Sequence, residues 1–275
     1  MRLLALLALA ACSYQPPGET GTGDGPGKDA DRPDVPTASG PHLLLSEIFS
    51  EGPSDEFIEI FNPSQTAVAL DHVYLTDVAN YWSLPAGAPI SLATDFLAKF
   101  PDGSQLAAGG LIVIAVDGPA FQTTFGQTPA YTLRTPTSGA AEMTMIASLG
   151  SGGAISDEGE MVVLFEWDGQ RDLVRDIDIV VHGMPSGVNL LSKKDPVDGP
   201  DDNTDPTSYA TDSNIAMAMT SRTEDGGDAS YQRLTIDENE IETGGNGVGG
   251  HDETSEPLDT TWSSTSPANP GSFSF

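Results

Sequence analysis

The sequence contains one cysteine, Cys12, among 275 residues. A single cysteine excludes an internal disulfide framework, so buried apolar side chains must stabilise the folded part. Cations are also scarce: 11 Lys plus Arg stand against 41 Asp plus Glu, a formal net charge of −30. Such a charge repels nucleic acid and anionic headgroups, which excludes nucleic-acid partners, and it attracts divalent cations. Adaptation of an exported surface to salt or crowding is the alternative explanation of the charge.

The N-terminus lacks the ~20 apolar residues that a membrane-spanning helix needs. It has one charge, Arg2, followed by a short apolar run that ends in small residues, which is the layout of a secretory signal. Leu9–Cys12 resembles the bacterial lipobox. We therefore expect residues 1–11 to be a signal peptide that is removed, and Cys12 to carry lipid. An ordinary signal peptide is the alternative. Ser13, where a retention signal has Asp, favours the outer membrane or cell surface.

Large apolar residues are almost absent between Ser13 and Pro41, where Gly, Pro, Asp and Thr dominate. Such a composition cannot build a core, so residues 12–41 are predicted to be the lipidated cysteine and a disordered linker. A flexible chain of this length spans roughly 30 Å. The linker would thus hold a folded domain, residues 42–275, away from the membrane surface.

Beyond the linker no long stretch has a helical period, and short β-like segments alternate with turns. Glu56–Phe61 alternates charged and apolar residues at first, as a half-buried strand does. Leu111–Val116 is wholly apolar, which predicts a buried central strand. Further strands are predicted at residues 42–49, 67–70, 73–76, 81–84, 160–167 and 173–181, with a short helix at 121–125.

The segment around residues 160–181 predicts a hairpin whose turn is Asp168-Gly169. In its second strand, Asp176 and Asp178 alternate with isoleucines, which predicts one solvent-facing and one buried face. Strands bounded by turns at this spacing favour an all-β sandwich. An acidic stretch at about 184–228 interrupts the pattern and is predicted to be a loop insertion.

Several segments together resemble the lamin-tail domain family. The resemblance is carried by Leu44–Ile48, Asp55–Pro63, Val68–Asp71, Val73–Asp77, Ala108–Val116, Glu158–Phe165, Ser230–Arg233 and Trp262–Gly271. It implies an immunoglobulin-like β-sandwich over residues 42–275, with the acidic insertion at about 184–228 as a departure from the usual pattern. A sandwich of another family is the alternative.

Recognisable catalytic motifs are missing. None of the four histidines, His42, His72, His182 and His251, lies in a known motif, and there is no Gly-x-Ser-x-Gly elbow. The run Gly244–Gly250 lacks the following Lys-Ser/Thr of a phosphate loop and predicts a flexible loop. We therefore expect a non-enzymatic module that binds an extracellular protein or glycan, or serves structurally in the envelope. The alternative is an accessory domain of an exported nuclease or phosphatase.

One short polar loop gathers six oxygen-bearing side chains, the ligands that calcium prefers. They are Asp195, Asp198, Asp201, Asp202, Asn203 and Asp205. The spacing mimics an EF-hand loop, but Pro206 stands where that loop needs Gly. The sequence therefore predicts an irregular calcium site, with a merely solvated acidic loop as the alternative.

Three other polar residues are predicted to have structural roles. Glu47 and Glu59 lie in predicted strands, and a buried carboxylate needs a partner. Because cations are so scarce, Arg233 is the expected partner of both.

Overall fold

The computed structural model describes residues 42–52, 54–87, 95–147, 155–156, 159–183, 193, 195–201, 203–213, 227–242 and 244–273. The predicted signal peptide, Cys12 and the linker lie outside these residues, as do Asp202 and much of the stretch 184–228. Within the described chain, no helix has both the length and the apolar character needed to cross a membrane.

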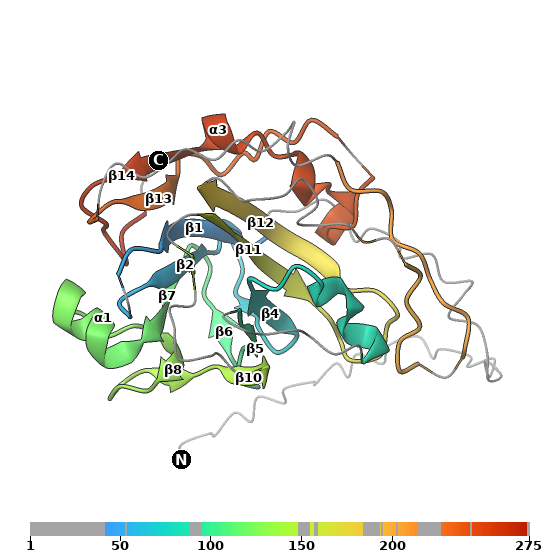
Figure 1. Ribbon diagram of the computed structural model, residues 1–275, viewed down its shortest axis with the longest axis horizontal. Coiled ribbons are helices and arrows are strands. Elements are labelled where there is room, and N and C mark those ends of the chain that lie inside the picture. Colours follow the sequence, from blue (N-terminus) through green and yellow to red (C-terminus); the bar gives the residue numbers. More distant parts are fainter. Residues whose placement is uncertain are drawn as a thin grey trace, which may run out of the picture.

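Two β-sheets form the body of the molecule (Figure 1). The larger sheet contains β1 (Leu44–Phe49), β2 (Phe57–Phe61), β7 (Leu111–Asp117), β8 (Tyr131–Thr135), β9 (Ala141–Glu142), β13 (Ser230–Arg233) and β14 (Trp262–Thr265). The smaller contains β4 (Val73–Thr76), β5 (Leu97–Lys99), β10 (Thr144–Ala147), β11 (Gly159–Glu166) and β12 (Arg175–Gly183). A separate pair joins β3 (Val68–Ala69) to β6 (Gln105–Leu106).

The strand order is β14-β13-β1-β2-β7-β8-β9 in the larger sheet and β10-β5-β4-β11-β12 in the smaller. The main hydrophobic cluster takes buried side chains from both sheets, among them Ile58, Ile114, Val163 and Val180. Two sheets that share one core confirm the predicted all-β sandwich. The strands predicted at 42–49, 56–61, 111–116, 160–167 and 173–181 all form.

A helix covers the other face of the larger sheet. It is α1 (Gly118–Phe125), and the Asp117 side chain caps it by accepting a hydrogen bond from the Ala120 amide at 2.9 Å. Phe121 packs against Phe57 in a second apolar cluster. The helix connects the parallel strands β7 and β8, so one crossover is added to a mainly antiparallel sandwich.

The prediction of a strand at residues 81–84 is wrong, because these residues lie in the 3-10 helix η1 (Tyr81–Ala86). The Tyr81 amide donates to the Val78 oxygen, which closes a turn, and Pro85 has no amide proton to extend a β-ladder. Several strands were also not predicted: β5, β6, β8, β9 and β10. Each has two to five residues, too few for a period of two to stand out.

The strand β12 is buried on both faces, which corrects the predicted solvent-facing side. Asp176 is 1% exposed and Asp178 is fully buried. Two 3-10 helices, η2 (Val248–Gly250) and η3 (Glu253–Ser255), contact this strand, and Figure 1 shows their red segment beside the yellow β12. The chain after β13 therefore covers two aspartates that a simple alternation would leave in water. A short helix, α3 (Leu258–Thr261), leads from there into β14.

Candidate functional site

Two aspartates two residues apart on β12 organise the polar interior. The pairing register shifts between them, because Asp178 pairs with Leu164 and Asp176 pairs with the adjacent Phe165, so the usual alternation of faces along a strand does not apply to this pair. Each contacts one buried cation: Asp176 contacts Lys193, and Asp178 contacts Arg233. In a chain with 11 Lys plus Arg, two of them thus lie fully buried, each against an aspartate of the same strand.

Arg233 forms the centre of the first cluster. Its Nη2 donates to Asp178 Oδ2 at 2.7 Å, and its Nη1 donates to Glu256 Oε1 at 2.7 Å. Its Nε donates to the Leu45 backbone oxygen at 2.8 Å. The guanidinium lies over the Trp262 ring at 4.9 Å from the centroid. A planar cation with several donors suits such a buried, multiply bonded position.

Histidines and further glutamates surround the same spot. His42 Nε2 lies 2.9 Å from Glu238 Oε2, and His251 Nδ1 lies 2.6 Å from Glu240 Oε2. The two imidazole rings meet edge to face at 5.1 Å between centroids. Glu253, on η3, is 3% exposed and completes the group. We call this group, with Asp178, Glu256 and Arg233, the His/Glu centre.

Within the His/Glu centre, three overlapping triads bring their ligand atoms within 4.8 Å of one another. They are His42–Glu238–His251, Glu240–His251–Glu253 and Asp178–Glu238–Glu253. Donor atoms on one ion, each about 2.0–2.2 Å from it, are themselves at most about 4.4 Å apart. The triads therefore need only small side-chain adjustments to bind one ion.

The His/Glu centre carries excess negative charge. Its carboxyl groups are Asp178, Glu238, Glu240, Glu253 and Glu256. Burial raises the pKa of Glu256 to about 8, although Arg233 opposes the rise, and burial raises the pKa of Asp178 to about 6 against the same opposition. Burial also raises the pKa of Glu253 well above its ordinary value, and nearby carboxylates raise it further. The raised pKa values favour a proton on these groups or a cation beside them, a role that Arg233 already has for Asp178 and Glu256.

Several oxygens in the centre have no hydrogen-bond partner among the described residues: Asp178 Oδ1, Glu238 Oε1, Glu240 Oε1 and Glu253 Oε1. A buried carboxylate oxygen without a partner lowers the stability of the fold by about 1–3 kcal/mol or more, unless a proton or a cation compensates it. Each of these oxygens belongs to a residue of the three triads, as expected of a ligand set.

The glycine run around Gly247 makes room for Glu253. A Cβ on Gly247 would lie 2.7 Å from Glu253 Oε1 and 2.8 Å from the His251 oxygen, so a side chain there would displace both. Gly245 likewise approaches the backbone of Asp252 too closely for a Cβ. The run therefore packs closely around the candidate ligands at Gly245 and Gly247, and its predicted flexibility stays a prediction.

The donor set indicates the class of ion. Imidazole nitrogen with carboxylate oxygen is the combination that zinc, manganese and iron accept, whereas calcium prefers oxygen alone. His42 and His251 therefore favour a divalent transition metal. His251 keeps 27% of its side chain exposed, so one side of the centre is close to solvent. His42 and His251 lie far apart in sequence and outside any motif, which is why the sequence did not predict them as ligands.

The predicted partners of Arg233 are wrong. In the pairing of β1 with β13, Glu47 lies opposite Gln232, so the neighbouring Arg233 points to the other face of the sheet. Glu47 instead accepts from the Ser230 hydroxyl at 2.5 Å and the Asn269 amide at 3.0 Å.

Glu59 has similar neutral partners: it accepts from the Ser46 hydroxyl at 2.8 Å and the Gly271 amide at 2.6 Å. Burial raises its pKa to about 7, with both hydrogen bonds opposing the rise. Neutral donors therefore bind both glutamates, although Glu47 Oε2 has no hydrogen-bond partner among the described residues.

The predicted calcium loop is closed on itself. Reciprocal 2.8 Å backbone bonds join Val197 and Thr207. Asp201 accepts from both the backbone and the side-chain nitrogen of Asn203, and Asn203 accepts from the Asp205 amide. Asp198 and Asp201 come within 4.8 Å of Asp172, which the sequence did not single out.

The remaining predicted ligands of this loop do not join that group. Asp195 and Asp205 are exposed, and Asp202 lies outside the described residues. Asp172 already accepts from the Gly199 amide and the Thr207 hydroxyl. Calcium binding here remains a prediction.

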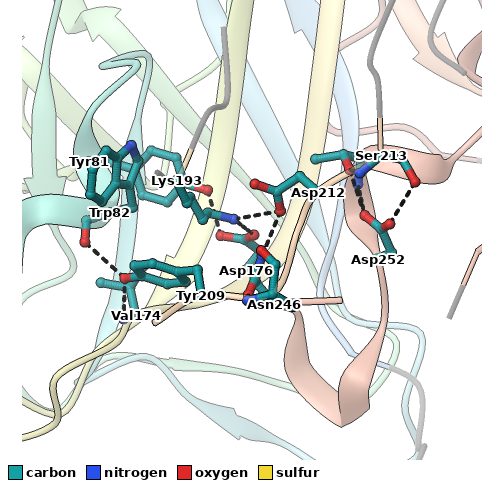
Figure 2. A network of polar contacts seen from close by, with 12 residues as sticks. Tyr81, Trp82, Val174, Asp176, Lys193, Tyr209, Asp212, Ser213, Asn246 and Asp252 are labelled. Carbon is teal, nitrogen blue, oxygen red and sulfur yellow. Dashed lines mark hydrogen bonds and ion pairs between the residues drawn. The ribbon is translucent and has the colours of Figure 1, made fainter. Parts of the chain in front are cut away.

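The second cluster surrounds Lys193 (Figure 2). The Lys193 ammonium contacts Asp176 and lies 3.2 Å from Asp212. The Tyr81 hydroxyl donates to Asp176 Oδ1 at 2.5 Å, and the Asn246 side-chain amide donates to Asp212 Oδ1 at 2.6 Å. We call these residues, with Tyr209, the lysine cluster.

A cleft of about 300 Å³ lies next to the lysine cluster. Leu173, Val174, Arg175, Tyr209 and the glycine-rich segment around Asn246 line it. A mainly apolar cleft with an aromatic ring and a few polar groups is typical of a small-molecule binding site.

Comparison with known proteins identifies no family. No family model matches the chain, and no curated protein matches it. Among solved structures, it is similar to a DUF4876 family protein from Bacteroides thetaiotaomicron VPI-5482, with 15% sequence identity and a TM-score of 0.45. The match covers 76% of this chain and 65% of that one, so this chain spans less than two thirds of its neighbour.

Proposed function

We propose that the protein is an exported, surface-tethered and non-enzymatic β-sandwich module that is stabilised by a divalent transition metal in the His/Glu centre. One observation carries this: buried carboxylate oxygens with no hydrogen-bond partner among the described residues belong to glutamates and an aspartate that form triads with one another and with two imidazoles. A cation there would neutralise the excess charge and occupy these oxygens at once.

The ligands favour a structural role for the metal. They come from segments far apart in the chain: His42 before β1, Asp178 on β12, Glu238 after β13 and Glu253 on η3. One ion would therefore join the start of the domain to the segment that covers β12. His42 also follows the predicted linker directly. A force on the linker would therefore act on the sandwich at the metal site.

The finer parts of the proposal come from the sequence. Lipid on Cys12 would anchor the chain to the membrane, at the outer membrane or cell surface. The lamin-tail resemblance supports a module that recognises an extracellular protein or a glycan, and the cleft beside Tyr209 offers a place for such a ligand. The strong negative charge argues against nucleic acid as a partner.

The alternative function is an accessory module of an exported hydrolase. The partial exposure of His251 favours it, since catalytic metals keep one coordination position open to water. Turnover of phosphate esters or nucleic acid by the metal-loaded full chain, abolished by His251→Ala, would establish the alternative and overturn the non-enzymatic assignment.

A thermal melt of the full chain tests the metal-stabilised module. At zinc or manganese about 100-fold above Kd, we expect the melting temperature to rise by about 5–10 °C over that in chelator. His251→Ala should lose most of this rise. His72→Ala, which changes an exposed histidine, should keep it. Equal melting temperatures with chelator and with each ion would contradict the proposal.

The predicted calcium loop has its own arm in the same experiment. A calcium-specific rise that survives His251→Ala and is lost in Asp201→Asn would assign calcium to residues 195–205. A melting temperature that calcium leaves unchanged would mean that this acidic loop is solvated and does not bind calcium.

A further inference from the structure

Lys193 lies in surroundings that are unusual for a lysine. Its side chain is fully buried, and its Nζ lies 5.7 Å and 5.5 Å from the ring centroids of Tyr81 and Tyr209. Figure 2 shows the chain reaching between these two residues toward Asp176 and Asp212. An ordinary lysine keeps its ammonium in water, because burying that charge is costly.

Asp176 and Asp212 are arranged differently around the Lys193 nitrogen. Asp176 is the more deeply buried, and the Tyr81 hydroxyl donates to its other oxygen, Oδ1. Asp212 contacts the nitrogen from a second direction and is held by the Asn246 amide. One carboxyl group is thus polarised by a hydroxyl donor, and the other lies within hydrogen-bond distance of the nitrogen.

Proton transfer inside this group needs no change of net charge. Suppose that Lys193, Asp176 and Asp212 share two protons. An ammonium beside one carboxylate and one carboxylic acid then has zero net charge. A neutral amine beside two carboxylic acids also has zero net charge. Burial raises the pKa of Asp212, against the opposing effect of Lys193, which favours a proton on that carboxyl. Burial lowers the pKa of Lys193, but Asp176 and Asp212 raise it by more, so the neutral amine is the minor form from which a reaction would start.

From this geometry we propose that Lys193 and Asp176 join in an intramolecular isopeptide bond, with Asp212 as the proton relay. The neutral Lys193 amine attacks Cγ of the protonated Asp176 carboxyl, forming the C–N bond. The Tyr81 hydroxyl stabilises the charge that develops on Oδ1. Asp212 takes a proton from the nitrogen and gives one to the departing hydroxyl. One water molecule leaves, and no oxidant or reductant is involved.

The bond would replace the missing disulfides. The bond joins two residues that are 17 positions apart in sequence, and so links β12 to the start of the described acidic segment. A covalent closure restricts the unfolded chain and keeps the acidic segment on β12 during proteolysis or under pull from a tether. This proposal does not depend on the metal in the His/Glu centre.

Mass spectrometry of the full chain, digested with trypsin after denaturation, tests the bond. Trypsin cuts after Lys and Arg, so the uncross-linked chain yields peptide 176–193. A cross-linked Lys193 resists trypsin, and we expect peptide 176–194 instead, lighter by one water. Cyanogen bromide cuts after Met184, between the joined residues, and the two halves should stay together. This peptide contains no Asp-Gly pair, so succinimide formation at such a pair cannot mimic the loss.

Variants separate the proposed roles. In Lys193→Arg and in Asp212→Asn, the tryptic peptide that begins at residue 176 should have its full sequence mass. The first variant lacks the nucleophile, and the second lacks the proton relay. Lys99→Arg, which changes a lysine in a surface ion pair, should keep the loss of one water. If a variant fails to fold, the wild-type digest still decides. Recovery of peptide 176–193 at its sequence mass as the main wild-type product would overturn the proposal.

Discussion

At the scale of single residues, the unusual feature is the burial of charge in a chain without disulfides. Asp178, Glu256 and Arg233 are each at most 1% exposed, and they depend on one another. Such a group is weak evidence for added stability, because desolvation offsets the attraction. Loss of one member, however, leaves the others uncompensated.

Arg233→Met should therefore lower the free energy of unfolding by about 3–5 kcal/mol, because two carboxylates lose their buried partner. Urea unfolding of the full chain at neutral pH measures the change. Arg171→Met is the matched control: that ion pair with Asp168 is partly exposed, and its loss should cost at most about 1 kcal/mol. Equal effects of the two substitutions would contradict the role given to Arg233.

His182 gives a prediction about pH. Burial lowers its pKa from 6.5 to about 4, and neither ring nitrogen has a partner within the described residues. Between these values the unfolded chain binds the proton and the folded chain does not, so this residue reduces stability as pH falls from 6.5 toward 4.

His182→Phe removes that titration and keeps a ring against Tyr231. From pH 7 to pH 5, the wild type should lose about 2 kcal/mol more unfolding free energy than the variant does. Urea unfolding of both proteins at the two pH values gives the difference. A parallel decline of the two would show that His182 remains uncharged in both states or is solvated when folded.

At the scale of elements, the junction of β2 with β6 depends on one side chain. The Asn62 amide donates to the backbone oxygens of Thr66, Leu106 and Ala107 at 2.9–3.1 Å, and its oxygen accepts from the Ser64 amide at 3.0 Å. Asn62 is fully buried. One residue thus satisfies backbone groups that no β-ladder reaches.

Asn62→Ala should lower the free energy of unfolding by about 1–3 kcal/mol, since it leaves buried carbonyls unpaired. Gln65→Ala, at an exposed position of the same turn, should change it by less than about 0.5 kcal/mol. Chemical denaturation of both variants checks the comparison. An Asn62→Ala variant as stable as the control would mean that water replaces the lost amide.

The sandwich was predictable because strands such as β7 and β11 carry apolar runs that mark buried strands on their own. Arg233 was expected to pair with a buried carboxylate, but only the fold decides which one. The His/Glu centre was not predictable, because His42, Asp178 and His251 come together only when the segment after β13 folds over β12. Because β12 is covered in this way, the alternation of Asp176 and Asp178 with isoleucines does not mark a solvent-facing side.

At the scale of the whole molecule, the proposal combines a lipid anchor, a linker and a sandwich with a polar interior. Cys12→Ser should prevent lipidation and cleavage, so the protein should leave the membrane fraction and keep residues 1–11. Fractionation of the expressing bacterium with N-terminal sequencing measures both. Ser13→Ala is the control and should remain anchored. A Cys12→Ser protein that stays in the membrane fraction would contradict the anchor, and one that is still cut would contradict the lipobox.

The central claim is that the His/Glu centre binds a metal, and counting bound ions tests it most directly. The full chain is exposed in turn to zinc, manganese and cobalt, dialysed and analysed by plasma mass spectrometry. We expect one of these ions to be retained in stoichiometric amount by the wild type and by His72→Ala, and to be lost in a Glu253→Gln, His251→Ala double variant. Retention of no ion by the folded wild type, or equal retention by the double variant, would contradict the account.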